Sequence, residues 1–247
     1  MIEGTYLAVE KPLLYIHIFS GFLSLSIAYL LLFIKKGNKL HKKLGMIYVY
    51  GMTTIFLTAL PMSLLGEINE FLFVVAIFSF YLAFSGFRQG RSRDGAKDKI
   101  DKALSYFILF AALGLFFLAI TLFQSQDSMW ITATLFGTIS LFFGIRDQLR
   151  FRLTEKPNYY DRTSLHLILM LSATIATTTA FWVTIDFFSE DWLNWVSPNF
   201  VLVPVIIYFS KREKQKKNLQ KRTSSKNLFS YLILARFWAG SLILFIV

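Results

Sequence analysis

Residues 103–123 read ALSYFILFAALGLFFLAITLF, an unbroken run without a charged side chain. About 20 consecutive apolar residues in a helix are enough to cross the ~30 Å hydrocarbon core of a bilayer. Large apolar residues occur on every side of this segment, which excludes an amphipathic helix on the surface of a soluble protein. We therefore predict that it is a transmembrane helix.

The rest of the chain repeats this pattern. Apolar residues make up 55% of the 247 positions and charged residues 17%, whereas soluble domains carry roughly 25% charged residues. The sequence predicts an all-α fold, a polytopic transmembrane helical bundle that forms one domain over residues 1–247, with about eight spans and both termini outside. The predicted spans are roughly 12–34, 44–65, 68–87, 103–123, 129–145, 164–188, 192–210 and 228–247.

The connecting segments alternate in charge. Of the 26 Lys and Arg residues, all except Lys11 and Arg236 fall in the four connectors that follow the first, third, fifth and seventh predicted spans. Cytoplasmic loops collect Lys and Arg because such segments resist translocation, so the pattern predicts that these four connectors are cytoplasmic. A Lys-rich, Phe-rich composition without cysteine is typical of a protein of the bacterial cytoplasmic (inner) membrane.

Composition also excludes several classes of function. The formal net charge is +11, but the basic residues are divided among short connectors rather than gathered on one face, as nucleic-acid recognition requires. We therefore predict that the partner of this protein is the lipid bilayer and that the protein binds no nucleic acid. With no cysteine, disulfides and thiolate sites are excluded. No Walker loop, HExxH, GxSxG or GxGxxG motif occurs, so no catalytic residue can be named and enzymatic activity stays open.

The chain has three histidines, which are its candidates for chemistry. His41 lies at the cytoplasmic mouth of the second span, and His166 lies about one turn into the cytoplasmic end of the sixth. These two therefore share one membrane level, which favours a two-histidine haem or metal site. His17 lies near the opposite face, about 8 Å deep at 1.5 Å per residue, and has an ancillary role. Zinc ligands must lie within about 2.1 Å of one ion, so these depths disfavour a three-histidine zinc site.

Two glycines follow histidines at helical spacing. Gly21 and Gly45 stand four residues after His17 and His41, which places each glycine on the same helix face as its histidine. One interpretation is that they leave a flat space for a porphyrin beside the imidazole, with Arg162 and nearby lysines meeting the propionates. The other is that they permit close helix packing.

Within residues 17–52 the chain carries three short motifs, His17-x3-Gly21, Lys35-Lys36-Gly37 and Leu40-His41-x3-Gly45-x2-Tyr48. This pattern resembles an uncharacterised family of bacterial multispan integral membrane proteins, a domain of unknown function, and the resemblance continues to the sixth span with His166. More loosely, the pattern is similar to the cytochrome b and ferric-reductase class, in which histidines near helix ends bind haem. That resemblance implies haem b as the cofactor.

Arg236 is predicted to lie near the middle of the last span. Charges inside a bilayer are costly and usually functional, so Arg236 is one candidate for a counter-ion to an anionic substrate, cofactor or lipid headgroup. The alternatives are that the arginine snorkels to the interface or that the last helix inserts only partway. The fifth and sixth spans are rich in Ser and Thr, whose default role is tight helix packing and hydrogen bonding to their own carbonyls.

Three hypotheses about function follow. The first is an accessory or assembly subunit of a larger membrane-protein complex, suggested by short connectors and the lack of a reaction motif. The second is a b-type haem or metal-binding electron-transfer protein that uses His41 and His166. The third is a transporter of a small anion or a lipid, based on Arg236 and the hydroxyl-rich spans.

Overall fold

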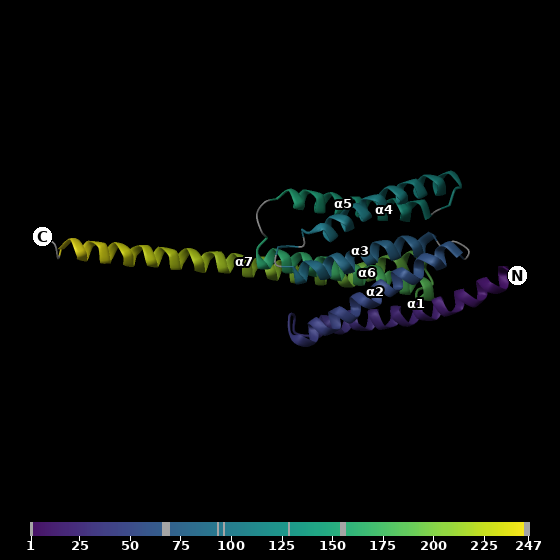
Figure 1. Ribbon diagram of the computed structural model, residues 1–247, viewed down its shortest axis with the longest axis horizontal. Coiled ribbons are helices and arrows are strands. Elements are labelled where there is room, and N and C mark those ends of the chain that lie inside the picture. The colour runs from purple at the N-terminus through teal and green to yellow at the C-terminus, as the bar shows by residue number, and fades with distance from the viewer. Residues whose placement is uncertain are drawn as a thin grey trace.

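The computed structural model describes residues 2–65, 70–92, 94–95, 97–127, 129–153 and 157–244, and side chains from residue 11 to residue 220 apart from 64–73, 191–192, 196 and the gaps just named. Across these residues the regular secondary structure is entirely α-helical, which confirms the predicted all-α class. The helices are α1 (Ile2–Phe33), α2 (Lys39–Leu65), α3 (Glu70–Arg91), α4 (Lys99–Gln124), α5 (Met129–Arg152), α6 (Tyr159–Ile185) and α7 (Asp191–Leu244) (Figure 1).

Most of these helices can cross a membrane. Among the described residues, six helices contain a segment that is long and apolar enough, in α1, α2, α4, α5, α6 and α7. Large apolar side chains on their outer faces are open to the surroundings, among them Phe110, Phe117 and Phe142, which are 78%, 71% and 64% exposed. Exposing so much apolar surface to water is unfavourable at about 25 cal/mol per Å². The chain is therefore built as a multi-pass membrane protein, with lipid as the solvent of these faces.

Helix α3 lies at the centre of the bundle. It packs against α2, α4, α5 and α6, while α1 packs on α2 and α6, and α7 packs on α6 (Figure 1). The main core lies between these helices and includes the fully buried side chains of Tyr48, Tyr81, Leu82, Ile108 and Leu169. The α4–α5 pair is joined to the rest of the bundle through α3.

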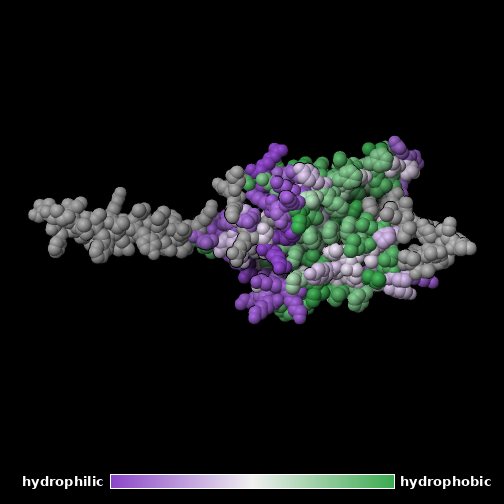
Figure 2. Space-filling model, viewed as in Figure 1, coloured by the Kyte–Doolittle hydropathy of each residue, from purple (hydrophilic) through white to green (hydrophobic). Residues whose placement is uncertain are grey.

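The basic connectors lie at one end of the bundle. The turns that join α1 to α2, α3 to α4 and α5 to α6 are found there, and α7 leaves the bundle at the same end (Figure 1). Figure 2 shows hydrophobic residues over the middle of the bundle and hydrophilic residues gathered at this end. The alternation seen in the sequence therefore corresponds to one basic end of the molecule. We call it the basic end.

Helix α7 differs from the prediction. Residues 211–227 were expected to form a loop between the seventh and eighth spans, but α7 is continuous from Asp191 to Leu244. This segment contains no Gly or Pro and is rich in Lys and Gln, which favour helix, so nothing in it ends the helix. A 54-residue helix is about 80 Å long at 1.5 Å per residue. The predicted count of eight spans and the predicted outside C-terminus are therefore not confirmed.

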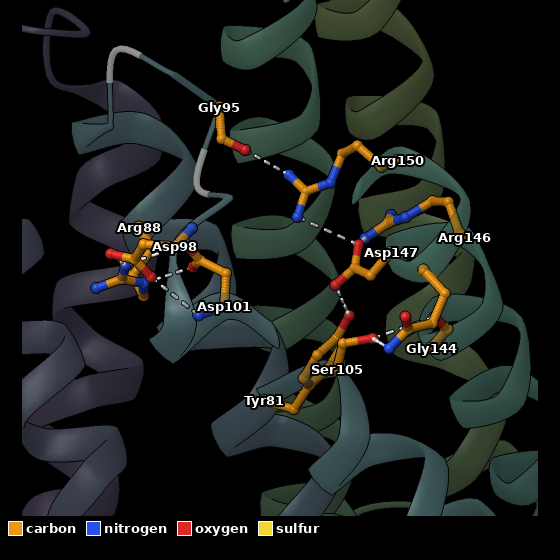
Figure 3. Close-up of polar contacts among 11 residues, drawn as sticks. Tyr81, Arg88, Gly95, Asp98, Asp101, Ser105, Gly144, Arg146, Asp147 and Arg150 are labelled. Atoms are coloured by element: carbon orange, nitrogen blue, oxygen red, sulfur yellow. Dashed lines mark hydrogen bonds and ion pairs between the residues drawn. The ribbon is translucent and has the colours of Figure 1, made fainter. Parts of the chain in front are cut away.

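A buried ionic contact joins the α4–α5 pair to α3. The Tyr81 hydroxyl of α3 donates to Asp147 Oδ2 of α5 at 2.7 Å, and Arg146 Nη2 donates to Asp147 Oδ1 at 2.9 Å (Figure 3). Arg150 Nη1 donates to the Gly95 carbonyl at 2.7 Å and so ties α5 to the α3–α4 connector. Tyr81 and Asp147 are only 0% and 3% exposed. The carboxylate thus has its charge and both oxygens satisfied inside the bundle.

A second ionic contact begins α4. Arg88 at the end of α3 donates from Nε to Asp101 Oδ1 at 2.5 Å and from Nη2 to Asp98 Oδ2 at 2.5 Å (Figure 3). Asp98 is the N-cap of α4, and the side chains of Asp98 and Asp101 form a reciprocal capping box with each other's backbone N–H groups. The ion pairs of Arg88 and the capping box of α4 therefore both fix the conformation of the α3–α4 connector.

The first prediction concerns the buried carboxylate. Asp147→Asn leaves two arginines beside a neutral amide, and breaking a buried ion pair typically costs about 3–5 kcal/mol. We expect a clear fall in the apparent Tm of detergent-solubilised protein, followed by the fluorescence of its five Trp residues. The matched control is Asp161→Asn, because Asp161 pairs with Lys217 but is 49% exposed, where a pair contributes about 0–1 kcal/mol. Equal Tm values for the two variants would contradict the structural role given to Asp147.

Candidate functional site

The structure brings His41 and His166 together at the basic end. Their ring centroids lie 6.4 Å apart and the ring planes are nearly perpendicular, at 81°. His41 lies in the first turn of α2 and His166 in the second turn of α6. The prediction that these two histidines share a membrane level therefore agrees with the structure, although 125 residues separate them in the chain.

The position of His41 is set by the turn that precedes α2. Gly37 adopts a positive φ of 80°, which a residue with a Cβ adopts only with strain. Asn38 Oδ1 then accepts a hydrogen bond from the His41 backbone N–H at 2.7 Å, as an N-cap residue does. The Nδ1 atom of His41 is buried and has no hydrogen-bond partner among the described residues. The turn thus presents an imidazole whose Nδ1 is unsatisfied.

The orientation of His166 is set by α3. Its Nδ1 lies 2.7 Å from the carbonyl oxygen of Gly86. A carbonyl only accepts hydrogen bonds, so Nδ1 carries the hydrogen, and in the neutral ring Nε2 keeps a free lone pair. Histidines that ligate metals commonly donate their second nitrogen to a backbone carbonyl in this way, which fixes the tautomer.

Two glycines of α3 leave the space in which His166 and Met170 of α6 pack. A Cβ at Gly90 would lie 2.8 Å from His166 Nδ1, and a Cβ at Gly86 would lie 2.8 Å from Met170 Sδ. Gly86 and Gly90 are one turn apart, so together they form a flat strip of backbone that receives one face of α6. Neither glycine was predicted to belong to the site, although the Gly-x3-Gly spacing of residues 86–90 indicates close approach of two helices.

Gly21 and Gly45 have a different surrounding. A Cβ added at either position would meet nothing within 4 Å. The interpretation that they permit close helix packing is therefore wrong. Among the described residues the space beside each glycine is open, and its use by a porphyrin stays a prediction.

His17 lies far from this pair. Its Nδ1 is 2.9 Å from Thr58 Oγ1 of α2, and Thr58 in turn donates to the carbonyls of Thr54 and Ile55, so the hydroxyl accepts from His17. Thr58 is 17 residues beyond His41 on the same helix, which corresponds to about 25 Å. A site that uses all three histidines is excluded, in agreement with the depths predicted from the sequence.

Two cations near the pair are held by backbone carbonyls. Lys36 Nζ donates to the carbonyls of Leu31 and Leu32 at 2.5 and 2.9 Å, which caps the end of α1, and its partial burial lowers the pKa of the ammonium group. Arg162, predicted to meet a propionate, donates from Nη1 to the carbonyl of Ser92. The side chain of Arg236 lies outside the described residues.

The separation of the two rings limits what can lie between them. A ring nitrogen lies about 1.1 Å from its centroid, so nitrogens of the two rings can approach to about 4.2 Å, twice the ~2.1 Å of a metal–imidazole bond. That is too long for a direct hydrogen bond and leaves room for one bridging atom. No group of three or more His, Asp or Glu side chains suited to a metal ion occurs in the described part of the chain.

The second prediction separates the two pairs of glycines. Gly90→Ala places a methyl group against the His166 ring, and overpacking of this kind typically costs about 1–3 kcal/mol. We expect its apparent Tm to fall by several degrees in the same fluorescence assay. Gly45→Ala is the control, because its methyl group meets open space and alanine favours helix by about 1 kcal/mol over glycine. A Gly45→Ala variant that is the less stable of the two would refute this account of the site.

Comparisons with known proteins do not add to this picture. The chain matches no protein-family model, no curated protein and no solved structure. The resemblance to an uncharacterised membrane family therefore stays a prediction, and the function has to be inferred from the geometry of the site.

Proposed function

We propose that this chain is a multi-pass membrane protein that binds haem b through His41 and His166. The supporting observation is the pair of imidazoles 6.4 Å apart, one held by the Gly86 carbonyl and the other with a buried, unpartnered Nδ1. Both come from helix ends at the basic end of the bundle. Two imidazoles that are carried by the first turns of packed helices form a preorganised ligand pair.

The number of ligands favours haem over an isolated metal ion. Structural zinc takes four protein ligands and catalytic zinc three, and the described residues around this pair supply two. Haem iron has four equatorial nitrogens of its own and needs protein ligands only in its axial positions. A bis-histidine pair is therefore a complete set for haem and an incomplete one for zinc. Haem supplies one-electron redox chemistry when it is bound.

The chain's own residues would tune such a centre. The Gly86 carbonyl raises the basicity of His166 through its Nδ1–H, while Gly90 leaves room for the ring against α3. Lys36 places a positive charge near the pair, and it donates hydrogen bonds to two neutral carbonyls. A nearby cation favours the more negatively charged state of a bound ligand.

The basic end is proposed to face the cytoplasm of a bacterial cell, following the positive-inside rule. The N-terminus lies at the other end of the bundle (Figure 1), in keeping with an outside N-terminus. Residues 228–244 carry a single charged side chain, Arg236, and an eighth crossing by this segment stays a prediction.

The other two hypotheses have no comparable support at the level of residues. Docking to a larger complex stays a prediction. The transporter hypothesis rested on Arg236, whose side chain lies outside the described residues, and on hydroxyl-rich spans. In those spans Thr134, Thr138, Thr174 and Thr178 each donate to a carbonyl of their own helix. That is the packing role expected by default.

The third prediction is spectroscopic. In an absorbance scan from 350 to 700 nm, protein purified from haem-replete bacterial membranes should show a Soret band, together with weaker bands at longer wavelength that sharpen on reduction by dithionite. His41→Ala and His166→Ala should each lose the band, because one axial ligand is removed. His17→Ala should keep it, because His17 is bonded to Thr58 about 25 Å away.

Iron and copper analysis of the same samples identifies the metal. About one iron per chain, with matching haem content, supports the proposal. A colourless and monodisperse protein from haem-replete cells, without bound iron, would overturn it. A band that survives in both His41→Ala and His166→Ala would assign the haem to other ligands.

The fourth prediction concerns orientation and uses the absence of native cysteine. Single cysteines are placed at Lys35, at the basic end, and at Gln124, at the end of α4. In intact cells a membrane-impermeant maleimide should label Gln124→Cys, and it should label Lys35→Cys only after the membrane is disrupted. The reverse pattern would invert the proposed topology. A cysteine added after residue 247 reports in the same assay whether an eighth crossing exists.

A further inference from the structure

The two sides of the basic end differ in how their charges are neutralised. On the side of α3, α4 and α5 the chain supplies its own carboxylates: Arg88 pairs with Asp98 and Asp101, and Asp147 pairs with two arginines. On the side of α1 and α2 it supplies none, because residues 11–66 contain neither Asp nor Glu. Positive charge without a neighbouring acid in the sequence is therefore concentrated at the turn between α1 and α2.

Five lysines lie in this turn and at the start of α2. We call the region the α1–α2 corner and define it by Lys35, Lys36, Lys39, Lys42 and Lys43 (Figure 2). Lys36 is held by the carbonyls at the end of α1 and by the Phe209 ring of α7, whose centroid is 5.3 Å from Nζ. The other four are exposed and form no ion pair within the described part of the chain. Like charges this close repel one another, so an anion bound between them would be stabilised.

Two of these lysines begin a stripe of exposed side chains along α2. Lys39, Lys43, Met46, Tyr50 and Leu57 follow one another at intervals of 4, 3, 4 and 7 residues, which places them on one face of the helix. The three apolar members are 38%, 72% and 60% exposed, so no described helix covers this face. At 1.5 Å per residue, Tyr50 lies about 10 Å from Lys43, within the ~15 Å of one bilayer leaflet. The stripe thus combines cations at the basic end with an apolar surface as long as a leaflet is thick.

The turn itself also carries exposed apolar side chains. Phe33, the last residue of α1, is 86% exposed, and Leu40, between the lysines at the start of α2, is 51% exposed. In water such side chains would be unfavourable, whereas apolar side chains mixed with lysines are typical of segments at the membrane interface. This mixture favours a lipid, which has both a charged and an apolar part, over a soluble acidic protein.

We propose that the α1–α2 corner binds an anionic phospholipid of the leaflet at the basic end. The lipid phosphate lies between the ammonium groups of Lys39 and Lys43, which are about 6 Å apart along the helix axis. The acyl chains lie along Met46 and Tyr50. Lysine binds phosphate as a point charge, and clusters of basic residues next to a transmembrane helix recognise anionic lipid headgroups.

This lipid site goes beyond the proposed haem site and does not depend on it. Neither Lys39 nor Lys43 is a member of the ligand pair, and the stripe is defined by exposure and charge alone. The same reasoning excludes an equal site at the start of α4. Its first turn also presents two exposed lysines, Lys99 and Lys102, but the carboxylates of Asp98 and Asp101 belong to the same turn.

The fifth prediction measures lipid binding by native mass spectrometry of the full chain in mild detergent. The protein is titrated with phosphatidylglycerol or with phosphatidylcholine of the same acyl chains, and the mass of each species counts the lipids bound. We expect the wild-type protein to bind its first phosphatidylglycerol more tightly than phosphatidylcholine. One lysine contributes about a five-fold gain in affinity for an anionic lipid surface. Lys39→Gln/Lys43→Gln should therefore lose on the order of ten-fold in affinity for phosphatidylglycerol and bind phosphatidylcholine as before.

The matched control is Lys99→Gln/Lys102→Gln, which removes the same charge from the first turn of α4. Its affinity for the first phosphatidylglycerol should equal that of wild type. Equal losses in the two double variants would overturn the site, because binding would then follow net charge alone. Equal affinity of the wild-type protein for the two lipids would also overturn it, and would leave the corner lysines to a soluble acidic partner. A colourless protein that still prefers phosphatidylglycerol would overturn the haem proposal alone.

Discussion

Every backbone N–H and C=O group inside a bilayer has to find its hydrogen bond within the protein, because hydrocarbon offers none. Helices meet this requirement within a single segment, and the described part of this chain uses them throughout. The same constraint governs the polar side chains. His17 reaches Thr58, His166 reaches the Gly86 carbonyl, and Asp147 takes hydrogen bonds from Tyr81 and Arg146. Several contacts between helices in this bundle therefore join polar groups that hydrocarbon could not satisfy.

This requirement links the fold to the site. Helix α3 contributes both the Gly86 carbonyl that orients His166 and Gly90, against which the ring lies. A few residues earlier in the same helix, Tyr81 holds α5 through Asp147. A change in the packing of α3 would therefore move the α4–α5 pair and the histidine pair together. The site depends on the central helix of the bundle and not on a flexible connector.

Polar groups without a partner have a different meaning in this setting. In water an unpaired hydroxyl is solvated at little cost. Inside a bundle, the free-energy cost of burying it without a hydrogen bond has to be offset by other interactions. The Nδ1 of His41 and the hydroxyls of Tyr48 and Ser24 are such groups. All three lie on helices that also carry or contact a histidine. Among the described residues, buried hydroxyls without a partner also occur on α3, α5 and α7, at Ser79, Ser140 and Ser210.

By itself, the sequence determined the helical class, the greater part of the spans and the gathering of the basic connectors at one end. It did so because hydropathy and charge act locally and can be counted along the chain: the uncharged run 103–123 lies within α4 (Lys99–Gln124). Counting residues from the span ends also placed His41 and His166 at one depth. It could not show that the two rings face each other, that Gly86 and Gly90 rather than Gly21 and Gly45 contact an imidazole, or that Asp147 is buried against two arginines. Those facts depend on how each helix is rotated about its axis and which neighbours it has, and rotation is decided by contacts between segments far apart in the chain. The continuity of α7 was missed for the opposite reason: a charged stretch was interpreted as a loop, although its residues favour helix and contain nothing to end one.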